Sequence, residues 1–516
     1  MYKTWSGSLK TNIPIQRPKN NDEVSLILKR ARINGHKVRV MGATHSEDNL
    51  TVTDIDNKTE IISLFDYRNK DWSLLLNTKD DTVRIEAGRS FLDLISFLRP
   101  RQYILRTNTA GPFFTIGGVI SNSVHGASID EGFIHENVHS MLVMFANGSI
   151  KEITDPVELS YFRCSFGLLG IILCITLKVK KINHLQMSVI HKTFKDGEWS
   201  RAIVTEFIND ILSQYQTAEF FFNGFNKIVC LVSKNLSGYK TILSRPDIFN
   251  KYTKIYKKQL RHNKEIALTG AVNVLPLINN HRLVDNHKLI AAMLTKLSMN
   301  VVSHEWSKSN LRANDNYYLT NNIFVARFNS IARFIPIDYM FDAINISREH
   351  WSYKNNKHFT DDELEQYVGL NNNDSYNNSH DHFYFNYPIE FRFINVKNPA
   401  FLTNIEPGHY ISIEFINNRT NDHEHIVHNH EYAKYFMSIE RDLAKLPNGG
   451  VHFGKGHGYD YDPVRKYVRP FQTDFEPIFS KDQIFKFKKL MRSYDPYTLF
   501  SSGSMMKYFD INKNDR

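Results

Sequence analysis

Cysteine and long apolar runs are both scarce in this sequence, and each scarcity excludes a class of protein. Three cysteines, Cys164, Cys174 and Cys230, with no CxxC spacing exclude a disulfide framework and a thiolate zinc site, and they are typical of a reducing compartment. The longest apolar run, 166–177, is well short of the roughly 20 residues that a membrane helix needs. The first residues lack the apolar stretch of a secretory signal. We therefore expect a cytoplasmic protein without a membrane span.

Clustered positive charge is missing as well, although the chain is basic overall. Its 64 Lys and Arg against 54 Asp and Glu give a net charge of +10, but the basic residues are scattered and form no block with interleaved aromatics. This disfavours a nucleic-acid partner and favours a surface that attracts an anionic cofactor or substrate. With 42% apolar residues over 516 positions, the chain can build cores for at least two domains.

Alternating strand and helix patterns fill the first 180 residues and predict an α+β domain. Val24, Ile27, Leu28 and Ala31 follow helical spacing after a cap at Asn21-Asp22. The other expected elements are strands at 37–41 and 82–86, a helix at 91–98, a hairpin at 141–154 around Asn147-Gly148, and a buried strand at 167–180.

From residue 184 onward the pattern is longer and more mixed, which predicts a second domain. An Asn-rich stretch, 371–382, is expected to be a surface loop. The elements expected beyond it are strands at 389–394 and 410–415, helices at 432–445 and 481–494, and a glycine-rich turn at 449–458.

The segment VRVMGATHS, 38–46, joins a strand to a turn of small residues. A strand that runs into Gly42, Ala43 and Thr44 leaves backbone N–H groups free at a tight turn, an arrangement that binds phosphate in proteins. His45 and Ser46 would then lie at the strand end, beside whatever the turn binds. The alternative is that His45 is only a polar loop residue, because short motifs often match by chance.

A run of small residues at 115–128 is the second candidate for a ligand site. Glycine lets a ligand approach the backbone closely, and serine hydroxyls offer hydrogen bonds. Tight packing of a helix against a sheet explains the same composition equally well. The third segment, 165–177, by itself indicates only a core strand after a turn with two glycines. The small-residue run contains Gly117, Gly118, Ser121, Ser123, His125 and Gly126.

In this order the three segments resemble the FAD-binding domain of the vanillyl-alcohol-oxidase (PCMH) type. More narrowly, the chain resembles the family of sugar-1,4-lactone and alditol oxidases, which includes gulonolactone, galactonolactone and arabinonolactone oxidases. Three later segments fit that family: IEFRF at 389–393 matches its Glu-x-Arg strand, HFGK at 452–455 its His-Trp-x-Lys motif, and DPYTLF at 495–500 its closing turn. The resemblance spans nearly the whole chain, with little contribution from 190–380.

The resemblance implies a two-domain α+β flavoprotein. Residues 1–185 would form the FAD-binding domain, 186–435 a substrate-binding cap domain built on an antiparallel sheet, and 436–516 a segment that returns to complete the active site. The implied reaction is FAD-dependent oxidation of a CH–OH group in a sugar-derived lactone or polyol. The implied partners are that small hydroxyl substrate and O2 or another electron acceptor.

The resemblance also implies which residues hold the cofactor. His45 would be joined covalently to the 8α-methyl group of the flavin, which fixes FAD in place. The pyrophosphate, the ring and the rest of the nucleotide would contact Gly42, Ala43, Thr44, Ser46, Gly117, Gly118, Ser121, Ser123, Val124, His125, Gly126, Gly170, Ile171 and Ile172.

Glu390, Arg392 and Lys455 are the catalytic residues that the resemblance implies. Hydride transfer to the flavin leaves negative charge on the ring, which a fixed cation such as Lys455 or Arg392 would stabilise. The substrate hydroxyl must also lose its proton, which Lys455 could accept only if burial or the neighbouring Arg392 favoured its neutral form. Glu390 can accept hydrogen bonds from vicinal hydroxyls. Alternatively, because alternate residues share one face of a strand, Glu390 and Arg392 form only a surface ion pair.

Three positions depart from the family pattern and leave alternatives open. Val124 stands where the family has a smaller residue or Thr, near the flavin carbon that meets oxygen, so oxidase and dehydrogenase are both possible. Ser123 replaces a Gly and Phe453 a Trp. A flavin oxidoreductase of a lipid-linked sugar or sterol is the enzyme alternative, because SVHG with Phe133 and Asn137 beyond it also resembles that group. A cofactor-free binding protein on the same fold is the alternative from another class.

Motifs for other ligands are incomplete. Residues 449–455 resemble the start of a phosphate-binding P-loop, but Gly456 stands where Ser or Thr is needed, and no GxGxxG follows a strand. HEWSK at 304–308 precedes the Glu-x-Arg strand and is not counted with the tail motif. A histidine-rich polar segment lacks the HExxH pattern, so no metal site is predicted. Its histidines are His423, His425, His428 and His430.

Overall fold

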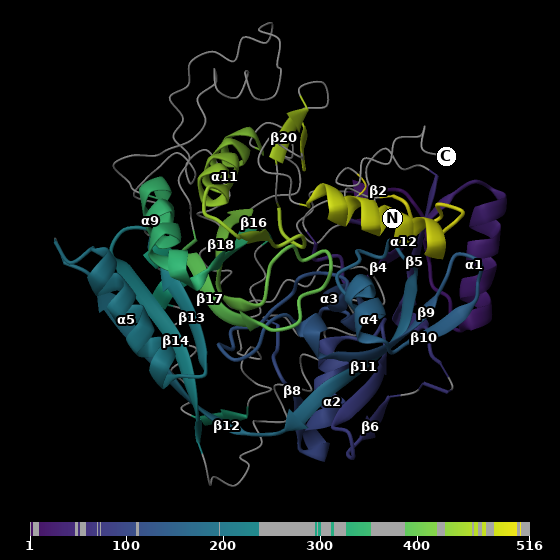
Figure 1. Cartoon of the computed structure of the whole chain (residues 1–516), viewed down its shortest axis with the longest axis horizontal. Helices are drawn as coiled ribbons and strands as arrows, with labels where there is room; N and C mark the ends of the chain where they lie inside the picture. Colours follow the sequence, from purple (N-terminus) through teal and green to yellow (C-terminus); the bar gives the residue numbers. More distant parts are fainter. Residues whose placement is uncertain are drawn as a thin grey trace, which may run out of the picture.

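β-Strands from the two halves of the chain assemble into separate sheets, and the chain passes from one half to the other between β11 (Ile171–Lys181) and β12 (His184–Thr193) (Figure 1). The prediction of an α+β chain with two domains is confirmed. The computed structural model describes residues 2–3, 10–46, 50–51, 58–69, 71–72, 74–109, 113–195, 197–236, 295–296, 298–300, 311–313, 327–351, 387–419, 429–456, 459–462, 467–470, 479–502 and 506.

A small parallel sheet holds the strand that leads to the first motif. β4 (Lys37–Met41) has the predicted bounds and pairs with β5 (Thr59–Ser63), which in turn pairs with β3 (Ile15–Gln16). The helix α1 (Asn21–Ile33) packs beside β4 through its buried apolar face. Its cap is Asn20 and not the predicted Asn21-Asp22, because the Asn20 side chain accepts a hydrogen bond from the Glu23 N–H at 3.0 Å.

An antiparallel sheet forms the centre of the same half. β11 lies in the middle of it, buried from Ile171 to Leu177, and begins after the predicted two-glycine turn. The predicted hairpin is present, and Gly148 has a φ of +86° at its turn, a conformation that favours glycine. The helix α2 (Phe91–Leu98) has the predicted bounds and a capping box at Ser90. The strand order is β10 (Ile150–Ile153), β9 (Val138–Met144), β11, β7 (Thr82–Glu86) and β6 (Leu75–Asn77), with β8 (Tyr103–Leu105) beside β11.

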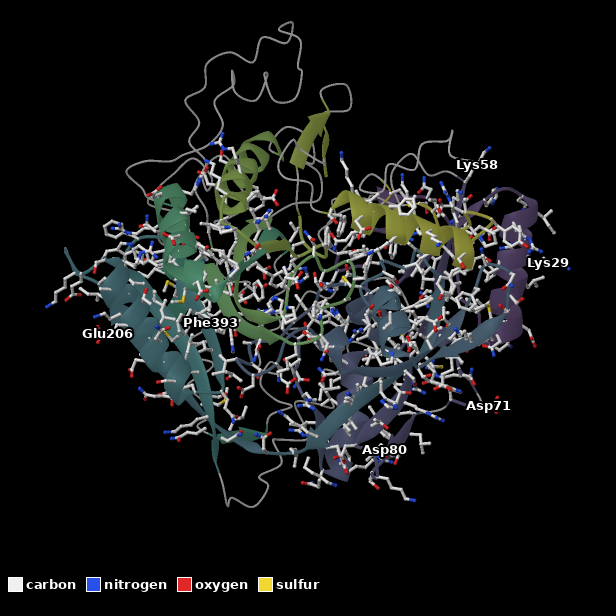
Figure 2. The ribbon with its side chains drawn as sticks, viewed as in Figure 1. Lys29, Lys58, Asp71, Asp80, Glu206 and Phe393 are labelled. Atoms are coloured by element: carbon white, nitrogen blue, oxygen red, sulfur yellow. The ribbon has the colours of Figure 1, made fainter. Side chains whose placement is uncertain are left out.

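The second half is built on one antiparallel sheet covered by helices, which we call the cap. The helices α5 (Arg201–Gln214), α9 (Met340–Trp351) and α11 (Asn429–Ala444) share one buried apolar cluster with this sheet (Figure 1). Figure 2 shows Phe393 inside the cap and Glu206 on the outer side of α5. The strand order is β15 (Leu311–Ala313), β12, β14 (Lys227–Leu236), β13 (Thr217–Phe222), β17 (Ile389–Val396), β18 (Gly408–Arg419), β16 (Arg327–Pro336) and β19 (Gly450–Val451).

The C-terminal part of the chain contacts both halves. α11, predicted at 432–445, begins three residues earlier and packs into the cap core, and β19 pairs with β16. α12 (Lys481–Tyr494) has the predicted bounds and packs through Phe487 and Met491 into the core of the first half. No helix among the described residues is long and apolar enough to cross a membrane. The remaining elements are β1 (Tyr2–Lys3), β2 (Lys10–Thr11), β20 (Tyr459–Asp462), β21 (Tyr467–Pro470), α3 (Ile116–Ile120) and α4 (Pro156–Phe162).

The turn after α12 fastens the end of the chain to β4. The buried Asp495 carboxylate accepts hydrogen bonds from the N–H groups of Leu499 and Phe500, at 2.8 and 2.7 Å. The Leu499 carbonyl accepts a hydrogen bond from Val38 N–H at 2.8 Å, and the Arg39 guanidinium donates to the Phe500 carbonyl at 3.2 Å. The DPYTLF segment therefore holds the strand that leads to His45. The Asn-rich segment 371–382 and the HEWSK segment lie outside the described residues.

Candidate active site

The first two motifs meet in space. A Cβ atom at Gly42 would lie 2.4 Å from Thr115 Oγ1 and 3.6 Å from the Cα of Gly118. A Cβ at Gly118 would lie 2.9 Å from the same Thr115 oxygen. The two contacts with Thr115 Oγ1 are too close for a side chain, so glycine is required at 42 and 118. The turn after β4 thus lies against the start of α3, as expected for two segments that bind one ligand.

The turn at 42–46 has free backbone donors. Its five residues are half-buried, and within the described part of the chain the N–H groups of Ala43, Thr44 and Ser46 donate no hydrogen bond to the protein. Thr44 has a φ of +59°, an unusual conformation for a β-branched residue. Successive N–H groups around such a left-handed residue form a concavity that binds anions. The turn therefore fits the diphosphate of a dinucleotide cofactor.

His45 follows that turn and lies against aromatic rings. Its imidazole stacks on Phe113 at a centroid distance of 4.4 Å and meets Phe114 edge-on at 4.8 Å. Burial against these neighbours, with a further contribution from the positive charge of Lys455, lowers the pKa of His45 to about 3. His45 is therefore a neutral imidazole at physiological pH, which is the form that can act as a nucleophile.

The small-residue run divides into an open and a buried part. Gly117, Gly118, Ser121 and Val124 are half-buried, as the turn at 42–46 is. Gly126 is packed tightly, because a Cβ there would lie 2.3 Å from Thr107 Oγ1. Close packing also explains Gly117 and Gly118, where a Cβ would lie 3.0 Å from Ala87 Cβ and 2.9 Å from Thr115 Oγ1. The half-buried residues of the run still have exposed surface that a ligand could contact. Ser123 is buried, and in the described part of the chain its hydroxyl has no hydrogen-bond partner.

The Gly170–Ile172 segment lies inside the core. A Cβ at Gly170 would lie 2.7 Å from Val143 Cγ1, and Ile171 and Ile172 are both buried in the main apolar cluster. Their side chains support the strand that packs behind α3. This placement gives Ile171 and Ile172 a packing role, and contact of the segment with a nucleotide stays a prediction.

Glu390 and Arg392 lie on β17, on the face of the cap sheet opposite the helices, because the alternate residues Phe391 and Phe393 pack into the cluster beneath the helices. The Arg392 guanidinium donates to Glu219 Oε1 on the neighbouring strand β13, at 3.1 Å from Nε and 3.0 Å from Nη2, and it is also ion-paired with Glu390. The exposed fractions of the side chains are 12% for Arg392 and 7% for Glu390. The interpretation of these two residues as a surface ion pair is therefore wrong.

Lys455 reaches the same group of charges from the turn after β19. Its Nζ lies 2.6 Å from Glu414 Oε1, and Glu414 is directly opposite Glu390 in the β17–β18 register. In this salt bridge the ammonium group of Lys455 has a carboxylate partner to which it donates. Lys455 is therefore suited to stabilise negative charge and poorly suited to accept the proton of a substrate hydroxyl.

His125 connects the two halves of the molecule beside these charges. Its Nδ1 donates to the Gly126 carbonyl at 2.8 Å, so Nε2 is the acceptor for the Ser412 hydroxyl of β18, at 3.1 Å. Burial, followed by the nearby positive charge of Arg392, lowers the pKa of His125 to about 3. The His452 ring lies 5.7 Å away, and its Nδ1 accepts a hydrogen bond from Gly454 N–H at 3.1 Å. Two neutral histidines therefore line the junction between the first half and the cap.

Three residues of this group were not identified from the sequence: Glu219, Ser412 and Glu414. His452 stands in the HFGK motif, but no role was predicted for it. A signal was present for the two glutamates, because AEFFF at 218–222 and ISIEF at 411–415 each place one carboxylate in an apolar strand. A charge buried in this way must be paired, and it often marks a functional site.

Metal binding finds no support in the described part of the chain, where no group of three or more His, Cys, Asp or Glu could hold an ion. The predicted absence of a metal site stays a prediction. The side chains of His423, His425, His428 and His430 lie outside the described residues.

Comparison with known proteins defines the class to which this arrangement belongs. Residues 14–154 match the protein family described as FAD binding domain, a span that contains the turn at 42–46 and the small-residue run at 115–128. FAD is therefore the cofactor, as predicted.

Among individual proteins, the chain is similar to sugar-lactone oxidases. It is 28% identical over 183 residues to L-gulonolactone oxidase of Bos taurus, covering 35% of this chain and 40% of that protein. It is 26% identical over 194 residues to D-arabinono-1,4-lactone oxidase of Candida albicans, covering 34% of each. The matched segments span less than half the length of these relatives. The resemblance inferred from the motifs is thereby confirmed.

The fold extends over the whole chain. A cholesterol oxidase from B. sterolicum superposes with a TM-score of 0.66 at 15% identity, covering 98% of this chain and 96% of that one. A solvent-stable cholesterol oxidase superposes with a TM-score of 0.65, also at 15% identity, covering 97% of this chain and 96% of that one. The predicted two-domain FAD-binding fold is confirmed.

Proposed function

We propose that this chain is an FAD-dependent oxidoreductase that oxidises a CH–OH group of a sugar-derived lactone or polyol. One observation carries the proposal: Lys455 interacts with both parts of the site. Its positive charge acts on His45 in the turn after β4. Its ammonium group is salt-bridged to Glu414, which belongs to the same group of charges as Arg392 and Glu390. Residues that hold a flavin and residues that bind hydroxyls therefore share one site. The similarity to two kinds of lactone oxidase supports the same substrate class.

The cofactor would be held by the turn after β4 and by α3. The donors of Ala43, Thr44 and Ser46, with the open faces of Gly117 and Gly118, would bind the diphosphate. His45, neutral and fixed against Phe113, would bond covalently to the flavin. FAD when bound supplies the acceptor for a hydride from the substrate carbon. In this scheme residues 1–185 are the FAD-binding domain, 186–435 the cap, and 436–516 the segment that brings Lys455 to the site.

The cap would supply the substrate-binding groups. Arg392 and Lys455 donate hydrogen bonds, and the carboxylates beside them accept hydrogen bonds from hydroxyls. Because each cation already has a carboxylate partner, the site suits an uncharged, hydroxyl-rich substrate. Val124, half-buried beside the open glycines, lies where the family resemblance implies that oxygen approaches, so the final acceptor is O2 or another oxidant.

Acid precipitation of the FAD-loaded protein tests the cofactor claim. Yellow colour that stays in the pellet, and is lost to the supernatant in His45→Ala, supports a flavin bound covalently through His45. His139→Ala is the control, because His139 is exposed on β9. Colour that always leaves with the supernatant argues against the covalent bond. A protein that stays colourless after FAD is added contradicts the flavoprotein assignment and favours the cofactor-free binding protein.

Anaerobic mixing with candidate substrates tests the substrate class. Loss of the flavin absorbance with a 1,4-lactone or an alditol, and not with a sterol, supports the proposal. The reverse result favours the alternative of a sterol or lipid-linked sugar, which the fold of cholesterol oxidase also accommodates. Subsequent exposure to O2 or to an artificial acceptor identifies the oxidant.

A further inference from the structure

Three carboxylates and two cations meet on the face of the cap sheet opposite its helices. Glu219 of β13, Glu390 of β17 and Glu414 of β18 contact Arg392 or Lys455, and each carboxylate residue is more than nine-tenths buried. If all five groups were ionised, one negative charge would remain uncompensated among the described residues at this site. An uncompensated buried charge is strongly unfavourable. One proton is therefore expected to stay within the group.

The geometry locates that proton between two of the three carboxyl groups. Glu414 has a cation of its own in Lys455, at 2.6 Å. Glu219 and Glu390 share Arg392: Glu219 is opposite Arg392 in the β13–β17 register, and Glu390 is two residues before it on the same face. Both carboxyl groups therefore depend on one cation, and a proton shared between them would compensate the second negative charge. Glu390 Oε1 contacts Arg392 but accepts no hydrogen bond among the described residues.

We propose that Glu219 and Glu390 form a carboxyl pair that shares one proton, is held in place by Arg392, and accepts the proton of the substrate hydroxyl. This inference rests on the proposed function, because it assigns a group to one step of that reaction. Two carboxylates that share one proton behave in the same way in enzymes where the ionised member acts as a general base.

The proposed step balances in atoms and electrons. The O–H bond of the substrate breaks, and its proton bonds to the ionised carboxylate of the pair. The C–H bond of the same carbon breaks, and its electron pair leaves with the hydrogen as a hydride to the bound FAD. The carbon becomes a carbonyl and has lost two electrons. The salt bridge of Lys455 with Glu414 stays ionised throughout, so Lys455 remains a hydrogen-bond donor.

Electrostatics in the site agree with this arrangement. Burial raises the pKa of Glu390 well above its usual range, and the negative charges of Glu219 and Glu414 add to this against the opposing effect of Arg392. Burial alone would also raise the pKa of Glu414, but Lys455 and then Arg392 outweigh it and lower that pKa. Three further titratable groups act with these charges. The same three carboxylates help to raise the pKa of the buried Tyr387. Burial lowers the pKa values of His125 and His452, and the positive charges of Arg392 and Lys455 contribute to both shifts.

Infrared spectroscopy of the FAD-loaded protein tests the shared proton directly. Protein labelled with 13C-glutamate and its unlabelled counterpart are compared at neutral pH, so that only glutamate bands shift. We expect a carbonyl band of a protonated glutamic acid that also shifts in D2O. The band should disappear in both Glu219→Gln and Glu390→Gln, because each variant leaves equal numbers of carboxylates and cations. Glu440→Gln, at a buried glutamate of α11 paired with Arg333, should keep it.

Two infrared results would overturn the proposal. One is a wild-type protein with no protonated glutamate band, a result that needs no variant to fold. The other is a band that persists in Glu219→Gln and Glu390→Gln when both variants still bind FAD with the wild-type visible spectrum.

Kinetics then separate proton acceptance from simple positioning of Arg392. We expect Glu219→Gln to lower kcat by roughly 10²-fold or more and to change both the pH profile and the solvent deuterium isotope effect. A rise in KM alone, with an unchanged pH profile, would mean that Glu219 only holds Arg392, and the proposal would fail.

If the infrared band behaves as expected but no lactone, polyol or sterol is oxidised, the proton-sharing pair stands and the proposed function fails. If oxidation occurs without the band, the pair fails and the function stands.

Discussion

The salt bridge between Lys455 and Glu414 joins a residue that the sequence motifs identify to one that they do not. Glu414 is 8% exposed, so removal of either partner leaves a largely buried charge without its counterion. We expect Glu414→Gln and Lys455→Met each to lower the free energy of unfolding by about 1–3 kcal/mol. The double variant should lose less than the sum of the two by about 1–2 kcal/mol. Chemical denaturation of the four proteins measures this coupling.

An exposed salt bridge on α12 provides the matched control. Lys486 and Asp482 are 2.7 Å apart, but their side chains are 58% and 68% exposed. Solvent and salt screen such a pair, so the same cycle of variants there should give a coupling below about 0.5 kcal/mol. Equal couplings for the two pairs would contradict the view that Glu414 and Lys455 interact in a buried site.

The residues of the candidate site show how far single residues can be identified from the sequence. His45, Glu390, Arg392 and Lys455 stand in short motifs whose spacing is visible in the sequence. Glu219 could not be paired with Arg392, because they are far apart in the sequence and become neighbours only through the β13–β17 register. A register depends on how whole strands pack, and no local pattern fixes it. The motifs therefore identified the site residues that stand in local sequence patterns. The residues that contact them could be identified only from the structure.

Among the secondary-structure elements, the turn at 495–500 has the most direct effect on the cofactor site. Two oxygens of Asp495 each accept one backbone N–H, and the residues so held are bonded to β4. We expect Asp495→Ala to lower the free energy of unfolding by roughly 2–4 kcal/mol, because buried N–H groups lose a charged acceptor. It should also reduce the fraction of protein that retains FAD, because β4 leads to the turn at 42–46. Urea denaturation and the ratio of flavin to protein absorbance measure the two effects.

The isosteric variant separates loss of charge from loss of both hydrogen bonds. Asp495→Asn keeps one oxygen that can accept a backbone N–H, so its effect on both measurements should be smaller than that of Asp495→Ala. If Asp495→Ala retained FAD as well as the wild-type protein does, the turn would not be needed to position β4.

Elements with a strong local signal were predicted closely. The predicted bounds agree with the structure for β4, β7, α2 and α12. The signals for these elements are local: a capping residue next to each helix, and apolar residues at the spacing of a helix or strand within each element. The start of α11 was missed by three residues. The strand order of the cap sheet could not be predicted from the sequence, because its central strands β13, β17 and β18 come from distant parts of the chain. Two strands of this sheet were identified from the sequence: β17, which carries the Glu-x-Arg motif, and β18, which follows it in the chain.

At the scale of the whole molecule, buried neutral histidines make stability depend on pH. His135 is fully buried, with its ring stacked on Phe133 at 5.0 Å and its Nδ1 3.2 Å from the Asn122 carbonyl. Burial, with a further contribution from the positive charge of Arg163, lowers its pKa from 6.5 to about 3. Between these two values the unfolded chain binds a proton on His135 that the folded chain does not. Stability from this residue is therefore complete above about pH 6.5 and declines as the pH falls toward 3.

The variant His135→Gln removes this titration and keeps a neutral polar side chain. We expect it to be less stable than the wild type at about pH 8, because Gln fills the site less well and loses the stacking on Phe133. On acidification to about pH 4.5, the wild type should lose roughly 2–3 kcal/mol more than the variant, since each pH unit below the unfolded pKa costs about 1.4 kcal/mol. Denaturant unfolding of both proteins at several pH values measures the difference.

His139→Gln on the exposed side of β9 is the control, and its stability should follow the wild-type curve. Parallel curves for the wild type and His135→Gln between about pH 4.5 and 8 would show that His135 is not held neutral in the folded protein.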